Sequence, residues 1–201
     1  MRILLIVAWL FAGLGGLIYH FGPGQEHQEL ESLDRRISDA RMLLSDEKFS
    51  EAVDQLEGVI TDLPEDDNQT SVGLKLQRCK AQMMSGQLPD ARVELEALLE
   101  EARADETIDP EMLAEVESTL AGSQYFMTWL MRLEGMPEEE WMPEIEASRQ
   151  HYRQVARAAE SLPDDEVGDE LALRSRQDLE AAIRLARMDL SELQGLPLPR
   201  Q

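Results

Sequence analysis

Two stretches of the chain, DEKFSEAVDQLEGVI at residues 46–60 and SGQLPDARVELEALL at residues 85–99, decide the fold. Aligned at an offset of 39 residues, they match alanine to alanine and leucine to leucine at the spacing of an amphipathic helix. Self-similarity of this kind predicts a repeated unit that buries its apolar face on its neighbours. The matched pairs are Phe49 with Leu88, Ala52 with Ala91, Leu56 with Leu95, Glu57 with Glu96, Val59 with Leu98 and Ile60 with Leu99.

Helical periodicity continues on both sides of these stretches, and the strong helix formers Ala, Leu, Glu, Arg, Gln and Met dominate the composition. The sequence therefore predicts an all-α protein. Asp109 and Pro110 are typical of a helix start, and Pro143 is expected to open the next helix. Because the connections are short, neighbouring helices should be antiparallel. The apolar stripes run over residues 30–44, 52–63, 72–83, 91–102, 113–130, 145–159 and 167–190.

The aligned stretches resemble the tetratricopeptide repeat over about residues 33–103. In that family a small residue early in the second helix lets the two helices of a hairpin touch. Ala52 and Ala91 match this small residue. Phe49 and Leu88 match the large residue at the turn, and Leu56 and Leu95 match the later core position. Pro64 matches the closing proline, and Ala40 and Cys79 match the small residue of the first helix.

Three features depart from the family pattern. The offset is 39 residues instead of the family's 34, and Leu43 and Gln82 stand where the family has tyrosine. Arg103 stands where a closing proline is expected. A longer, degenerate third hairpin is possible at residues 110–161. The resemblance implies a tetratricopeptide-like α-solenoid, whereas a generic antiparallel helical bundle would produce the same apolar faces.

The N-terminal segment is a separate unit. Residues 3–19 are uninterruptedly apolar, and His20 and Phe21 extend this run. A helix of that length spans roughly 26 Å, close to the thickness of a bilayer core. We therefore predict a transmembrane anchor over residues 3–21, ended by Gly22-Pro23-Gly24. A cleaved signal peptide is the alternative, but the run is long and its small residues lie inside it.

The domain and orientation predictions follow from this anchor. Residues 1–24 form the anchor and its stop, residues 25–193 the helical domain, and residues 194–201 an extended tail. Arg2 precedes the apolar run, and acidic residues follow it. The N-terminus is therefore expected in the cytoplasm, with the body outside it (periplasmic in a bacterium).

Charge and composition exclude several functions. The 201-residue chain carries a net charge of −22, and Arg2 is the only charged residue among the first 24. A body this acidic repels phosphate backbones, so we expect no nucleic-acid partner. With one cysteine (Cys79) and three histidines, the chain has little material for a metal site, and no cofactor motif occurs. No catalytic residues are predicted, and the protein is not expected to be an enzyme.

Two features resemble catalytic groups but have simpler explanations. The acidic runs at 138–140 and 164–166 precede helices, where solvated carboxylates are ordinary. His151 is expected on the surface between Arg149 and Arg153, and Cys79 is expected to be a buried, inert thiol.

The unusual segment is YFMTWLMRLEGM at residues 125–136, followed by Trp141 and Met142. A helix that is apolar on more than one side is either deeply buried or offers a surface to a partner. Trp, Tyr and Arg are typical anchors of interfaces, so Tyr125, Trp129, Arg132 and Trp141 are the candidate partner-binding residues. The alternative is that they form the core where the third hairpin meets the final helix.

These observations together predict a membrane-tethered scaffold or adaptor that presents an acidic helical-repeat domain to a protein partner with a basic segment. The resemblance extends to bacterial tethered repeat proteins that act in envelope assembly or protein export. A self-associating structural envelope protein, a homo-oligomer joined through its fifth and seventh helices, is the second hypothesis.

Overall fold

In the computed structural model the described residues are 23–64, 67–160 and 166–194, with side chains from residue 31 to residue 193 outside the gaps and residues 166–169. Every regular element in these ranges is a helix, so the all-α prediction is confirmed. None of the described helices has the length and apolar content needed to cross a membrane. The predicted span at residues 3–21 lies outside the described residues. The helices are α2 (Pro23–Ser45), α3 (Phe49–Thr61), α4 (Asn68–Met84), α5 (Leu88–Ala104), α6 (Pro110–Leu133), α7 (Glu138–Ala159), α8 (Glu166–Arg187) and α9 (Leu190–Gln194).

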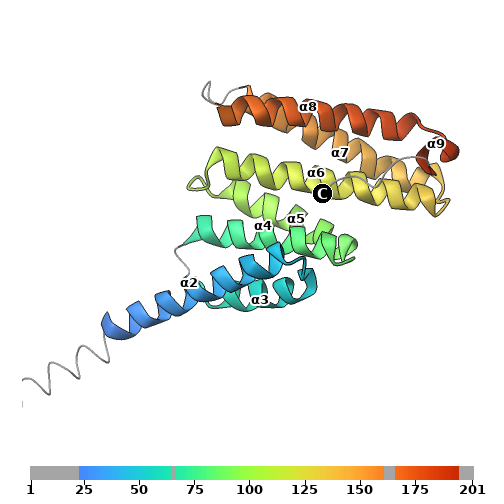
Figure 1. The fold of residues 1–201 in the computed structure, drawn as a ribbon. Coiled ribbons are helices and arrows are strands. Elements are labelled where there is room, and N and C mark those ends of the chain that lie inside the picture. The colour runs from blue at the N-terminus through green and yellow to red at the C-terminus, as the bar shows by residue number, and fades with distance from the viewer. Residues whose placement is uncertain (1–22, 65–66, 161–165, 195–201) are drawn as a thin grey trace, which may run out of the picture.

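The helices form an open row that starts with α2 and α3 and finishes with α8 (Figure 1). Each long helix makes its main contacts with the helix before it and the helix after it. Alternate helices also touch, α4 with α6 and α6 with α8. This arrangement makes packing local along the chain, as in repeat proteins.

Three successive apolar cores run along the row. The first lies between α2, α3 and α4, the second between α4, α5 and α6, and the third between α6, α7, α8 and α9. Helix α4 gives Leu74 to the first core and Leu76 to the second, while α6 gives Leu120 to the second and Ala121 to the third. Two helices are therefore shared between adjacent cores, which couples the hairpins.

The small residues of the sequence repeat lie where helices meet. Ala40, Ala52 and Ala91 are fully buried, and Cys79 is 1% exposed. Burial and the nearby Glu94 carboxylate raise the pKa of the Cys79 thiol to about 12, so this cysteine is inert at neutral pH, as predicted. The two aligned stretches thus bury the same three matched positions, Ala52 and Ala91, Leu56 and Leu95, and Val59 and Leu98.

The turns that close the three hairpins share one backbone geometry. In each turn one residue has a positive φ: Glu47 (59°), Gly86 (86°) and Gly135 (75°). In each, the next amide donates to a carbonyl five residues back, at 2.8 to 2.9 Å. This is the Schellman arrangement, which satisfies the last carbonyls of a helix. The α6–α7 hairpin is therefore equivalent to the first two, although its sequence does not align with them. The bonds join Lys48 N to Leu43 O, Gln87 N to Gln82 O and Met136 N to Met131 O.

The structure corrects two boundaries. Pro143 does not open a helix, because α7 begins at Glu138 and contains this proline in its second turn. The final helix does not run to Leu190: α8 ends at Arg187, and α9 is a separate short helix. Pro23 begins α2, where its missing N–H is not needed, and the apolar segment that Gly22-Pro23-Gly24 is predicted to end lies outside the described residues.

Replacing Glu47 by glycine should stabilise the protein, because Glu47 is the one described non-glycine residue in the left-handed region. Relief of the backbone strain exceeds the entropic cost of glycine, for a net gain of about 0.5–1 kcal/mol. Gly86→Ala is the matched opposite change and should cost about 1 kcal/mol, because alanine is strained at φ +86°. Nothing lies within 4 Å of the added Cβ, so no steric clash adds to this cost. Chemical denaturation measures both, and a destabilised Glu47→Gly variant would contradict the strain argument.

Candidate functional site

The four residues predicted to bind a partner come together in the third core. Trp141 of α7 is 8% exposed, and Tyr125 and Trp129 of α6 pack against the same cluster as partly buried side chains. Arg132 completes the group from the last turn of α6. The segment is therefore one cluster, and it lies between α6, α7, α8 and α9.

Arg132 contacts Trp141 of α7 and the C-terminal end of α8. Its guanidinium donates to the backbone carbonyls of Leu185 and Met188, at the C-terminal end of α8. Its Cζ also lies 4.7 Å from the ring centroid of Trp141, a cation–π contact. A cation placed there satisfies carbonyls that the helix itself leaves unpaired. Arg132 thus joins the end of α6 to the end of α8.

The aromatic neighbours are also engaged in packing. Tyr125 meets Phe126 edge to face, with ring centroids 6.1 Å apart and planes at 89°. The indole Nε1 of Trp129 is buried and has no hydrogen-bond partner in the described part of the chain. Burial raises the pKa of Tyr125 and that of Tyr152, so both phenols stay protonated. These contacts favour the alternative that the segment is core, and partner binding by these four residues stays a prediction.

A second polar group joins α5, α6 and α7. The Glu117 carboxylate is 7% exposed, and its Oε1 lies 2.9 Å from Arg103 Nη2 and 2.9 Å from His151 Nδ1. Arg103 also donates to Gln154 Oε1 at 3.1 Å. The expectation that His151 is a surface residue is wrong, because its side chain is only 19% exposed and pairs with Glu117. Each of these side chains has a partner within the group, so we interpret the group as a structural link between α5, α6 and α7.

The described carboxylates of the two acidic runs do not come together in a site. Glu138, Glu139 and Glu140 are exposed in the first turn of α7, as expected for solvated carboxylates at a helix start. In the run at 164–166, residues 164 and 165 lie outside the described residues. The described side chains include no group of three His, Cys, Asp or Glu that could hold a metal ion.

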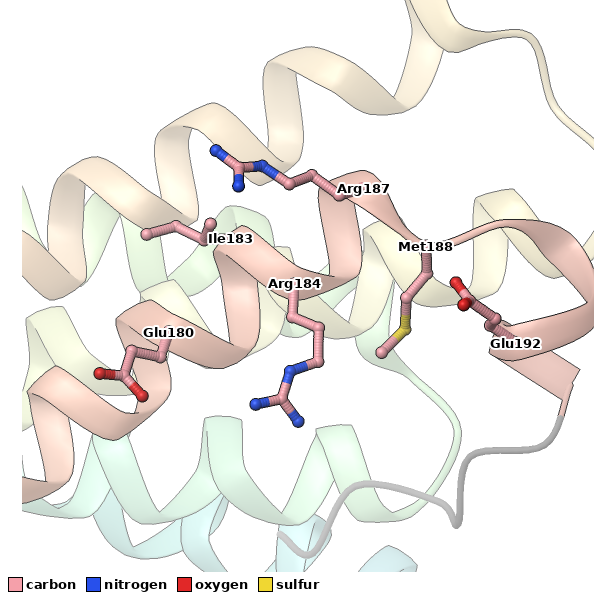
Figure 2. Close-up of a pocket in the computed structure, with 6 residues that line it drawn as sticks. All are labelled: Glu180, Ile183, Arg184, Arg187, Met188 and Glu192. Atoms are coloured by element: carbon pink, nitrogen blue, oxygen red, sulfur yellow. The ribbon is translucent and has the colours of Figure 1, made fainter.

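A hollow of about 490 Å³ lies on α8 and α9, the last helices of the row (Figure 2). Figure 2 shows that its side chains spread apart instead of converging, with Arg184 and Arg187 pointing in opposite directions. A polar outer face is what the terminal helix of a stacked array needs to remain in water. We therefore interpret this hollow as the capping face of the row. Its lining residues are Glu180, Ile183, Arg184, Arg187, Met188 and Glu192.

A cleft of about 430 Å³ lies between three alternate helices, α4, α6 and α8. Met112 and Leu171 give it apolar surface, and its carboxylates outnumber its one arginine, Arg174. No local sequence pattern predicts this cleft, because residues from three separate helices have to come together to form it. The lining residues are Gln69, Asp109, Glu111, Met112, Glu115, Glu170, Leu171 and Arg174.

Side-chain contacts hold α4 beside α6 below this cleft. Gln69 Nε2 donates to Asp109 Oδ2 at 2.9 Å, and the Asp109 amide donates back to Gln69 Oε1 at 3.2 Å. Further along, Lys80 Nζ pairs with Glu115 Oε1 at 2.6 Å. Gly73 permits close approach, since an added Cβ would lie 3.4 Å from Met112 Cε. The two helices are therefore fixed side by side along several turns.

Comparison with known proteins adds no family to this description. The chain matches no protein-family model and no curated protein.

Replacing Arg132 by alanine should destabilise the C-terminal end of the row. The change removes two charge-assisted hydrogen bonds to α8 and the contact with Trp141, a loss of about 2–4 kcal/mol. Hydrogen exchange should then rise most in α9 and the last turns of α8. Arg153→Ala removes an exposed arginine from α7 and is the matched control. Equal stability of the two variants would show that Arg132 has no structural role.

Stability should also depend on Asp178, whose pKa is raised by burial, with Arg174 partly opposing the shift. A carboxyl with a raised pKa in the folded state makes the protein less stable as pH rises from its ordinary value of 3.8 through the raised one. Asp178→Asn should therefore be more stable than the natural chain at neutral pH and equal to it at acidic pH. Denaturation curves between pH 3.5 and pH 7 test this, and parallel curves would contradict it.

Proposed function

We propose that the protein is a non-enzymatic interaction scaffold that binds a partner protein through a basic segment. In this proposal a tetratricopeptide-like domain is tethered to a membrane by residues 3–21, with the N-terminus in the cytoplasm and the body outside. The observation that carries the proposal is the open row of hairpins, in which alternate helices lie side by side (Figure 1). Such rows present extended surfaces suited to binding other chains.

Charge supports the choice of partner. The net charge of −22 gives the body a strong negative field, which attracts basic segments and raises their association rate. This attraction weakens as salt is added, because the Debye length falls from about 10 Å at 0.1 M to 3 Å at 1 M. The buried Glu117 and Cys79 are both engaged by polar groups of the chain itself, Glu117 by Arg103 and His151 and Cys79 by Glu94.

Photo-crosslinking in membranes tests the proposal. A photoreactive amino acid is placed in turn at Lys80, Leu130 and Leu173, three partly or fully exposed positions on α4, α6 and α8, in the full chain. We expect the chain to stay with salt-washed membranes, and at least one position to form an adduct with another protein whose yield falls as salt is raised.

Two results would contradict the proposal. Adducts formed only between copies of this chain would favour the self-associating structural protein instead. A chain released from membranes by a salt wash would remove the tether. Samples kept in the dark give the background for every position.

A further inference from the structure

We propose that the cleft between α4, α6 and α8 is the docking site for an extended protein segment that carries Lys or Arg side chains beside an apolar residue. This inference rests on the proposed function, and it names the surface and the chemistry that the partner needs. The hollow on α8 and α9 is not proposed, because its side chains diverge (Figure 2).

The carboxylates of the cleft divide into two that are occupied and two that are open to a ligand. Asp109 accepts from Gln69, and Glu115 is paired with Lys80. Glu111 and Glu170 are exposed and form no ion pair with any side chain that the structure describes. They come from α6 and α8, so they approach the cleft from two different helices.

Helix dipoles do not account for this charge. A carboxylate in the first turn is stabilised by the helix N-terminus, and Glu111 is such a residue. Glu115 and Glu170 lie in the second turns of α6 and α8, beyond the reach of that effect. The one basic group of the lining, Arg174, is directed partly to Asp178, at 4.0 Å. The cleft therefore keeps an excess of negative charge next to apolar surface.

Charge complementarity selects the occupant. A cationic side chain can pair with Glu111 and Glu170, while an apolar neighbour covers Met112 and Leu171. Lys and Arg carry apolar stems that pack well on such surface. A protein segment with both kinds of residue matches the cleft better than a small cation, which would leave the apolar part exposed.

A peptide of known sequence tests the site on the full chain in detergent. The probe is a labelled, capped peptide Ala-Lys-Leu-Arg-Ala-Lys, and the neutral counterpart has glutamine at the three basic positions. The cleft variant is Glu111→Gln with Glu170→Gln. The control variant, Glu138→Gln with Glu139→Gln, makes the same charge change in the first turn of α7, at the other end of α6.

We expect the basic peptide to bind the cleft variant about three- to tenfold more weakly than the natural chain at 0.15 M salt, the range for two exposed ion pairs. The control variant should stay within twofold, because roughly 35 Å of helix separates its changes from the cleft and the Debye length is about 8 Å. Thermal unfolding should show that both variants fold.

Several outcomes would overturn the inference. Equal weakening in both variants would mean that net charge alone attracts the peptide, and equal binding of the neutral peptide would remove the role of charge. No binding by the natural chain, or full competition by spermine at the same concentration, would also reject a protein-segment site. None of these results touches the crosslinking test, so the scaffold proposal stands or falls separately.

Discussion

Close contact between helices at small side chains is the constraint on which the structure depends. Ala40, Ala52 and Ala91 are completely buried, and Cys79 nearly so, which leaves room for the large leucines beside them to fill the spaces between helices. No hairpin buries its apolar face alone, because α4 and α6 each supply residues to two cores. Each hairpin is therefore stabilised by its neighbours, and the row remains open at its ends instead of closing into a bundle.

The same constraint produces the surface available for binding. When each helix packs on the next, alternate helices run parallel and bring their N-terminal ends to one side of the row. Residues that are distant in sequence then line one cleft, as Gln69 of α4, Glu111 of α6 and Glu170 of α8 do. The composition of the chain, with carboxylates in large excess, determines that this surface is acidic.

Local patterns in the sequence were sufficient to predict the helices and their small contact residues. The helical period of the apolar residues and the helix start and stop residues predicted the positions of α3 to α6 closely, because both signals act within a few residues. The prediction that Pro143 opens a helix was wrong, because a proline in the second turn of a helix and one at its start look alike in sequence. Arg132 and His151 could not be placed, because their partners are 53 and 34 residues away and no local pattern connects them. The third hairpin was expected as a longer, degenerate unit at residues 110–161, and its turn geometry at Gly135 became evident only in the structure.

The aromatic segment and the cleft are connected through α8, although they lie at different ends of it. Arg132 holds the C-terminal end of α8 against α6, and the third core packs along the C-terminal half of α8. The N-terminal half of the same helix supplies Glu170, Leu171 and Arg174 to the cleft. Arg132 therefore acts on the C-terminal end of α8, away from the residues of this helix that line the cleft. In the proposed docking, loss of the Glu111 or Glu170 charge would act on binding alone, since both side chains are exposed. Stability and binding are thereby assigned to different residues, with Arg132 in the first group and Glu111 and Glu170 in the second.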